Sequence, residues 1–413
     1  MNMFLLLVTA AIVGAYCIEN LADYLNIRHL DPDLPSEFSD VFDRKKYARS
    51  QEYARLQTRL SLIQSTVNLL LLLVFLLSGG LAWLDILVRS LSLNPVWTGL
   101  IFFAILGLAL DLVSLPFEIY GTFVLEESFG FNRMTPALFV KDKLKGYLLS
   151  LVIGAPILVG VLLFLGRFPE WGWFPAWVLI TLAMLLIHYL APTLILPLFN
   201  TFTPLEDGPL KQKIEDMARR NNFELSGIFV MDGSKRSTKS NAFFTGLGRK
   251  KRIALFDTLI ERHEPDELMG VLAHEIGHYQ HRHILKNMLL AIVKTGILLY
   301  LVSVLIGFDP LFTAFGLSQP SVYTGLIFFA LLYSPVSLAL GLGFNALSRR
   351  YEYQADDYAV RATRNPGALI DALKKLSADN LSNLTPHPFY VVLNYSHPPV
   401  LDRIRTLART ENG

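Results

Sequence analysis

The stretch Val271-Leu-Ala-His-Glu-Ile-Gly-His-Tyr279 decides how the rest of this chain is interpreted. His274 and His278 are four residues apart, so on a helix both imidazole rings lie on one face, about one turn apart. Two neutral imidazoles placed in this way can bind Zn²⁺ from one side, and Glu275 beside them is suited to take a proton from water. The pattern H-E-x-x-H therefore predicts a hydrolytic zinc site. The alternative is a solvated helix with incidental histidines.

A catalytic zinc ion takes three protein ligands and keeps one position open, so the two histidines need a further partner. The best candidate is Glu352, in the stretch Ser348-Arg-Arg-Tyr-Glu-Tyr-Gln-Ala-Asp-Asp357. Asp356 follows it by four residues on the same helical face and could accept the outer N–H of a liganding histidine. The alternative is that both carboxylates belong to a solvated charge cluster beyond a membrane helix.

Two further histidines follow the motif closely. His281 and His283 lie three and five residues after His278, offsets that do not continue one helical stripe. We therefore expect both to be polar surface residues and not metal ligands.

The composition indicates a membrane protein. Of the 413 residues, 52% are hydrophobic and 17% are charged, and the mean hydropathy is +0.41, which is too apolar for a set of soluble domains. The net charge of +2 gives no electrostatic footprint for nucleic acid. A single cysteine, Cys17, excludes an internal disulfide, so metal ligands must come from His, Asp and Glu.

Seven stretches are apolar over about 20 residues, the length of helix that crosses a bilayer. The first lacks the basic amino-terminal region and the cleavage site of a signal peptide, so we expect it to be a retained helix. The fold class predicted is an α-helical polytopic membrane protein. We place the stretches near residues 3–22, 62–88, 97–119, 147–166, 175–199, 287–307 and 322–346.

Basic residues are concentrated in two of the connections between these stretches. Residues 28–59 and 133–145 are rich in Lys and Arg, whereas residues 308–321 contain neither. Because cytoplasmic loops are enriched in Lys and Arg, both basic connections belong in the cytoplasm. The amino terminus is then expected outside, and the carboxyl terminus and catalytic site on the cytoplasmic side, of a bacterial inner membrane or, in a eukaryote, of the endoplasmic reticulum.

The predicted spans divide the chain into four regions. An α/β insert interrupts the spans, because periodicity predicts a helix over residues 210–221 and strands over residues 227–231 and 252–256. The regions are 1–199 with spans one to five, 200–286 with the insert and the H-E-x-x-H helix, 287–346 with spans six and seven, and 347–413 as a catalytic segment.

Ionisable residues occur inside the predicted spans. Asp111, Glu118 and His188 would be costly facing lipid, so they are expected to face a bundle interior or a water-filled space. The alternative is that they lie near helix ends and reach the interface, which suits Glu118 better than Asp111.

The two motifs together are similar to those of a known family. His274-Glu-Ile-Gly-His278 and Glu352-Tyr-Gln-Ala-Asp356, joined by two membrane spans, resemble the integral-membrane CAAX prenyl proteases. Residues 122–132, 197–206, 229–236, 240–242 and 396–399 match the pattern of that family as well. The resemblance implies seven transmembrane helices that enclose a large water-filled chamber, with an α+β zinc peptidase domain at the cytoplasmic side.

The resemblance also implies the metal site. It places one Zn²⁺ per chain between His274, His278 and Glu352, with Glu275 as the general base. Asp356 corresponds to the aspartate that supports a ligand in this family.

Substrate-binding residues are implied in the same way. Asn241 and Ala242 correspond to the pair that holds the substrate backbone as an added strand, a mode that grips main chain of any sequence. His397 and Arg403 correspond to the residues that donate hydrogen bonds to a substrate carbonyl or to its developing oxyanion.

The activity implied is that of a membrane-embedded zinc metalloendopeptidase. Its substrate would be a protein that loses three residues after a prenylated cysteine, or a related membrane protein or peptide in a bacterium. The alternative function is zinc-dependent quality control or clearing of membrane proteins, with secondary peptidase activity. A transporter is disfavoured because it would leave the zinc ligands unexplained.

Overall fold

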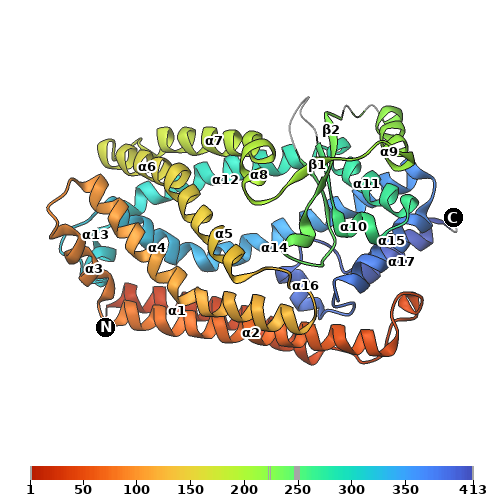
Figure 1. Ribbon diagram of the computed structural model, residues 1–413. Coiled ribbons are helices and arrows are strands. Elements are labelled where there is room, and N and C mark those ends of the chain that lie inside the picture. Colours follow the sequence, from red (N-terminus) through yellow and green to blue (C-terminus); the bar gives the residue numbers. More distant parts are fainter. Residues whose placement is uncertain (1, 222, 224, 246–251, 412–413) are drawn as a thin grey trace.

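The computed structural model describes residues 2–221, 223, 225–245 and 252–411. The molecule is elongated, with long helices running through most of its length and a small sheet with shorter helices at one end (Figure 1). Within the described residues, seven helical spans are long and apolar enough to cross a membrane, which confirms the predicted number.

Three short π-helical segments interrupt the spans. Residues Gly121–Glu126 extend α4, Ser150–Gly154 join α5 to α6, and Ala191–Ile195 join α7 to α8. Pro192 lies inside the third, where its missing N–H favours a locally widened turn. The helices that form the spans are α1 (Met3–Arg28), α2 (Arg44–Leu77), α4 (Pro95–Tyr120), α5 (Pro136–Leu149), α6 (Ala155–Arg167), α7 (Trp173–Leu190), α8 (Leu196–Phe199), α12 (His283–Ile306) and α14 (Val322–Thr363).

The predicted second span, residues 62–88, is wrong at its carboxyl end, and its helix begins well before the apolar stretch. Helix α2 begins at Arg44, where the Asp43 side chain accepts a hydrogen bond from the Lys46 N–H at 2.6 Å, and it ends at Leu77. Gly79 then adopts a left-handed φ of 77°, and a Cβ on Gly80 would lie 2.4 Å from the Phe75 ring. The tight glycine turn therefore separates a short helix, α3 (Gly80–Arg89), from the span.

The fourth span begins earlier than predicted, at Pro136 and not near residue 147. Its first turns include Lys143, whose ammonium lies 2.7 Å from Asp111 and 2.8 Å from Glu118 on α4. Hydropathy misses this part of the helix because it counts Lys143 as a free charge, whereas the partners of Lys143 lie on α4, distant in the sequence. Asp111 and Glu118 are therefore paired with a cation inside the predicted spans. The water-filled space expected beside them stays a prediction.

The sheet has four strands, β1 (Phe202–Pro204), β2 (Gly227–Met231), β3 (Ala242–Thr245) and β4 (Arg252–Phe256), in the order β1-β2-β4-β3. Strands β2 and β4 occupy the predicted residues and are parallel. The short strands β1 and β3, which were not predicted, pair antiparallel to β2 and β4. Strand β3 therefore lies at an edge of the sheet.

The peptidase end has its own hydrophobic core. Buried residues from the sheet and its covering helices, including Ile214, Ile253, Leu255 and Leu272, are each at most 1% exposed. This apolar burial holds the sheet against the helices that carry the motifs. The remaining helices are α9 (Pro209–Arg220), α10 (Asp257–Arg262), α11 (Pro265–Gln280), α13 (Asp309–Ala314), α15 (Pro366–Asp379), α16 (Pro388–Asn394) and α17 (Val400–Glu411).

Helix α14 connects the membrane part to the peptidase end. It has 42 residues, and at 1.5 Å per residue it is roughly 60 Å long. Its first half crosses the bundle and its last turns enter the peptidase core, where Glu352 and Asp356 are buried (Figure 1). The seventh span therefore delivers the predicted third ligand directly.

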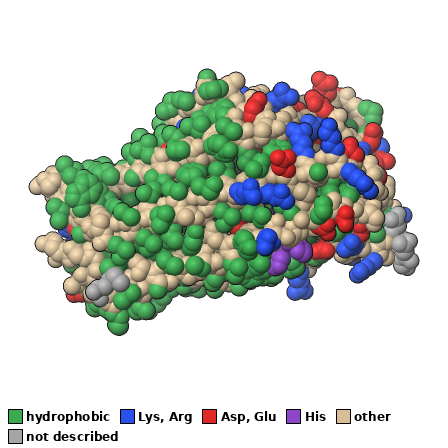
Figure 2. All heavy atoms as spheres, turned by 90° about the horizontal axis from the view of Figure 1, so that it is seen from below, with side chains coloured by type: hydrophobic (Ala, Val, Ile, Leu, Met, Phe, Trp, Pro, Cys, Tyr) green, Lys and Arg blue, Asp and Glu red, His purple; other side chains and the backbone are tan. Residues whose placement is uncertain are grey.

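The surface reflects this division. Hydrophobic side chains cover the part built from the spans, and Lys, Arg, Asp and Glu gather at the opposite end (Figure 2). Only 6–17% of the most apolar window of each span is buried inside the protein. Such limited burial is expected for helices that touch their neighbours along narrow seams, as in a ring, although the predicted chamber itself stays a prediction.

Candidate metal centre

The H-E-x-x-H helix, α11, has a well-defined start. The Glu264 side chain accepts a hydrogen bond from the backbone N–H of Glu267, while the Glu267 side chain accepts one from the backbone of Glu264. This capping box, with Pro265 in the first turn, satisfies N–H groups that a helix otherwise leaves open. Glu264 and Glu267 thus fix the start of the helix that carries the histidines.

The glycine of the motif allows close packing on α14. A Cβ on Gly277 would lie 3.0 Å from Cα and from the carbonyl oxygen of Ala355, which is fully buried. Any larger residue would push the helices apart, and with them the two histidines and Glu352. The motif therefore sets the distance between helices as well as supplying ligands.

The three predicted ligands meet at one point. His274 Nε2 lies 3.1 Å from His278 Nε2, and His278 Nε2 lies 3.2 Å from Glu352 Oε1. One ligand atom from each residue lies within 4.8 Å of the others, and among the described residues these three form the single such group. The structure thus brings together the pair and the distant carboxylate.

The three side chains do not satisfy all of each other's polar atoms, and a metal ion would satisfy the rest. Glu352 is 2% exposed, and its Oε2 makes no hydrogen bond, although His397 Nδ1 lies 2.9 Å away. A buried carboxylate oxygen without a hydrogen bond is costly unless a cation satisfies it. Two imidazole nitrogens and one carboxylate oxygen are a typical ligand set for Zn²⁺ with an open position.

Asp356 and Arg403 support the first histidine. Asp356 Oδ1 lies 2.8 Å from His274 Nδ1, and the guanidinium of Arg403 binds both oxygens of Asp356, at 2.8 and 2.6 Å. Burial alone would lower the pKa of His274, but the hydrogen bonds to Asp356 and Glu352 outweigh it and raise this pKa to about 9. The raised pKa favours a ring protonated on both nitrogens, so a metal must displace the Nε2 proton, while Asp356 keeps the proton on Nδ1.

The two residues expected to contact substrate carbonyls line the same pocket but differ in exposure. His397 is exposed, and it lines a pocket of about 510 Å³ next to the ligands. Arg403 is 9% exposed and is bound to Asp356, with Nη1 3.5 Å from Glu352 Oε2. Arg403 thus holds Asp356 while the His397 ring is exposed, and contact of either residue with a substrate carbonyl stays a prediction.

Glu275, the predicted general base, follows His274 on α11 and is half-buried. Its carboxylate makes no side-chain hydrogen bond within the described part of the chain, and its role as general base stays a prediction. Arg403 lies near enough to interact with it electrostatically.

The prediction that His281 and His283 are surface residues is wrong for His283. This residue is 2% exposed, and its ring stacks on Tyr351 with the centroids 4.0 Å apart. Helix α11 ends at Gln280, and Arg282 reverses the chain with a left-handed φ of 56°. Offsets along one helix do not apply across that turn, and Arg at a left-handed position gives no signal of it in the sequence.

The predicted substrate-binding pair lies at the open edge of the sheet. Ala242 begins β3, and Asn241 precedes it with an exposed side chain whose Oδ1 accepts the Ala242 N–H at 2.8 Å. Strand β3 pairs with β4 on one side, and it contacts α11. The edge therefore runs beside the helix that carries the histidines.

Two further residues fix this edge and were not predicted. Asn380 accepts a hydrogen bond from the Ser240 N–H at 3.2 Å and donates one to the Ser240 carbonyl at 3.3 Å. The Lys239 ammonium lies 2.7 Å from Tyr53 Oη and 3.0 Å from Glu126, which belong to spans two and three. No local pattern could reveal these contacts, because they join residues 113 to 186 positions apart.

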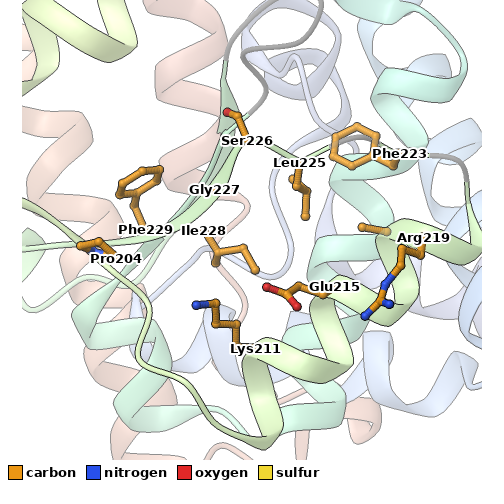
Figure 3. A pocket seen from close by; sticks show the side chains of 11 residues that line it. Pro204, Lys211, Glu215, Arg219, Phe223, Leu225, Ser226, Gly227, Ile228 and Phe229 are labelled. Carbon is orange, nitrogen blue, oxygen red and sulfur yellow. The ribbon is translucent and has the colours of Figure 1, made fainter.

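Figure 3 shows a different cleft at the peptidase end, of about 760 Å³. It lies between α9 and the strands β1 and β2, with Lys211 and Glu215 on one side and Phe229 on the other. None of the metal-site residues lines it.

Two family patterns together match nearly the whole chain. Residues 23–201 match the CAAX prenyl protease N-terminal family, described as having five membrane helices. Residues 204–411 match peptidase family M48. The boundary falls where the fifth span ends and β1 begins.

Individual proteins are similar over the same length. The CAAX prenyl protease 1 of Saccharomyces cerevisiae is 34% identical, over 97% of this chain and 94% of that protein. A CAAX prenyl protease 1 homolog of Dictyostelium discoideum is 38% identical, over 92% of each. The crystal structure of S. mikatae Ste24p superposes with a TM-score of 0.93 at 33% identity, over 98% of this chain and 99% of that one.

Proposed function

The chain belongs to peptidase family M48, and from this we propose that it binds one Zn²⁺ through His274, His278 and Glu352 and cleaves prenylated membrane-associated proteins. It is a multi-pass membrane metalloendopeptidase of the CAAX prenyl protease type. The observation that carries the zinc assignment is the buried Glu352 Oε2, which has no hydrogen bond and lies beside two imidazoles that face each other.

The chemistry follows from the positions of the side chains. Zn²⁺ at this site supplies a Lewis acid that polarises a carbonyl and lowers the pKa of water. Glu275 takes the proton of the attacking water and delivers it to the leaving amine. His397 donates a hydrogen bond to the carbonyl oxygen as negative charge develops there. Arg403 holds Asp356, and Asp356 holds His274.

The substrate backbone is held by the edge of the sheet. Among the described residues strand β3 pairs with β4 alone and contacts α11, and Asn241 and Ala242 lie at its start. An extended peptide there adds a strand through main-chain hydrogen bonds, which carry little sequence information. Selectivity must then come from the pocket beside His397 and from how the substrate reaches the site.

The substrate class follows from the relatives and from the position of the site. The relatives are named CAAX prenyl proteases, and the metal ligands lie where α14 leaves the apolar part of the molecule. We infer that the enzyme removes the last three residues after a prenylated cysteine. In a bacterium, a related membrane protein or peptide would take this place.

The orientation proposed places the metal centre on the cytoplasmic side. The polar first turns of α2, with Arg44 and Lys46, lie at the same end of the molecule as the sheet, and basic residues favour the cytoplasm. A reporter at Asp43 should therefore be cytoplasmic and one at Thr313 external. External labelling at Asp43 would reverse the orientation.

The test is cleavage of a farnesylated peptide by the purified protein in nanodiscs. The wild-type protein should release the carboxyl-terminal tripeptide, and Glu275→Gln should retain zinc but lose this activity, because an amide cannot take the proton. The same peptide without the farnesyl group is the control for substrate class. Tripeptide release by Glu275→Gln would contradict the mechanism, and equal cleavage of the unmodified peptide would favour the clearing function.

A further inference from the structure

The two histidine ligands have different partners behind them. His274 Nδ1 lies 2.8 Å from a carboxylate oxygen of Asp356. His278 Nδ1 lies 3.1 Å from another imidazole nitrogen, Nδ1 of His283. His283 has no role in the reaction proposed above, although it is buried and contacts a ligand directly.

The position of the proton in this histidine pair follows from the ligand geometry. His278 Nε2 faces His274 Nε2 and Glu352 Oε1, so its lone pair must be free for the metal. A neutral imidazole with a free Nε2 carries its proton on Nδ1, so His278 donates to His283. His283 Nδ1 then accepts, and its own proton lies on Nε2. That nitrogen lies 2.9 Å from Gln354 Oε1, which is an acceptor.

Two neighbouring rings stack on the His283 ring. Tyr351 stacks on it with the centroids 4.0 Å apart and the planes at 12°, and His281 stacks on it at 5.5 Å and 16°. With 2% exposure, the ring cannot turn without displacing these neighbours. Its Nδ1 is therefore fixed toward His278.

We propose that His283 is a positioning residue of the metal centre. It accepts the Nδ1 proton of His278 and so holds this ligand in the tautomer and orientation that zinc binding needs. The inference rests on the zinc assignment above. The two ligands are then held unequally, since Asp356 is charged and is bound by Arg403, whereas His283 is a neutral acceptor.

The hydrogen bonds also link the ligands across three helices. His278 belongs to α11, His283 begins α12, and Gln354 lies on α14, two residues after Glu352. Loss of His283 would remove the hydrogen bond that orients the His278 ring. It would also remove the hydrogen bond from α12 to Gln354, which lies near Glu352 on α14.

Two substitutions separate this role from simple packing. His283→Phe keeps an aromatic ring against Tyr351 but removes the acceptor. His283→Asn loses the stacking ring but places an amide oxygen close to the position of Nδ1. The control is His281→Phe, because His281 stacks on the same ring and makes no side-chain hydrogen bond to a ligand among the described residues.

The experiment measures the zinc dissociation constant of the full-length, metal-free protein in detergent, by competition with a chromogenic chelator. Thermal unfolding of each metal-free variant reports its fold separately. We expect His283→Phe to weaken zinc binding about 10–100-fold, the usual effect of losing a partner that orients a ligand. His283→Asn should recover most of that loss, and His281→Phe should match the wild type.

Wild-type affinity in His283→Phe would overturn the proposal, as would equal weakening in His283→Asn and His283→Phe, since the acceptor would then be irrelevant. Both results would leave the zinc assignment intact. Absence of zinc binding by the wild-type protein would remove the zinc assignment and this inference together.

Discussion

Two carboxylates are buried at opposite ends of α14, and they are held in different ways. At the end far from the sheet, Asp85 is 1% exposed and accepts hydrogen bonds from Tyr323 Oη at 2.5 Å and from Arg89 Nε at 2.8 Å. At the peptidase end, Glu352 is 2% exposed, yet its Oε2 has no hydrogen bond. Burial is therefore equal, but both oxygens of Asp85 accept a hydrogen bond, whereas Glu352 Oε2 accepts none although His397 and Arg403 lie nearby.

This difference distinguishes a structural acid from a proposed metal ligand. Asp85 is surrounded by its own donors, so it ties α3 to the first turn of α14 and needs nothing from outside. Glu352 faces imidazole nitrogens whose outer partners, Asp356 and His283, hold the ring nitrogens Nε2 toward it. Such an arrangement is stable when a cation occupies the common point.

The largest contrast is expected between Glu352→Ala and Asp85→Asn. Glu352→Ala should lose zinc and all peptidase activity, because two histidines alone do not hold a catalytic zinc ion. Asp85→Asn should keep both, and should lower the free energy of unfolding by about 1–3 kcal/mol, the cost of weakening a buried hydrogen-bonded group. Zinc content per chain and thermal unfolding of both variants measure the contrast. Full zinc occupancy in Glu352→Ala would break it.

The next largest effect concerns His397, which lies beside the same carboxylate but is exposed. His397→Ala should lower kcat about 10²–10³-fold through loss of one donor to the developing oxyanion, and should leave zinc content unchanged. Steady-state kinetics with zinc analysis make the measurement. Loss of zinc in a folded variant would make His397 a ligand, and an unchanged kcat would leave it no catalytic role.

A smaller effect is expected for Asp356, which acts through His274. Asp356→Ala should weaken zinc affinity or activity about 10–100-fold without abolishing either, because the ligand atoms remain and only their orientation loosens. Titration of the metal-free variant with zinc gives the number. Complete loss of zinc would place Asp356 among the ligands.

The smallest effect is a pH dependence of the peptidase end. Burial lowers the pKa of His263 below its usual value of 6.5, although Glu267 beside it acts in the opposite direction. In the unfolded chain this histidine takes up a proton near pH 6.5, and in the folded protein only at lower pH. Stability should therefore fall as pH drops below about 6.5 and then level off below the folded pKa. Unfolding of the wild type and His263→Gln between pH 5 and 8 measures it, and identical pH profiles would exclude the effect.

The sequence predicted those features that depend on local spacing or on average hydropathy. The number of spans, the two central strands and the meeting of His274, His278 and Glu352 follow from periodicity, from the H-E-x-x-H pattern and from the number of ligands that zinc needs. The carboxyl end of the second span and the start of the fourth were wrong, because a glycine turn at Gly79 and the pairing of Lys143 with α4 do not register in hydropathy. The burial of His283 depends on the left-handed turn at Arg282. The hydrogen bonds of Arg403 to Asp356 depend on how α17 packs on α14. Residue spacing encodes neither.

The central claim is that His274, His278 and the buried Glu352 on α14 together hold one zinc ion. Anomalous diffraction from crystals of the purified protein, collected on both sides of the zinc absorption edge, tests it most directly. The account predicts a single peak per chain, about 2.0–2.2 Å from His274 Nε2, His278 Nε2 and a Glu352 oxygen. A zinc peak elsewhere, or none in protein that cleaves its substrate, would contradict it.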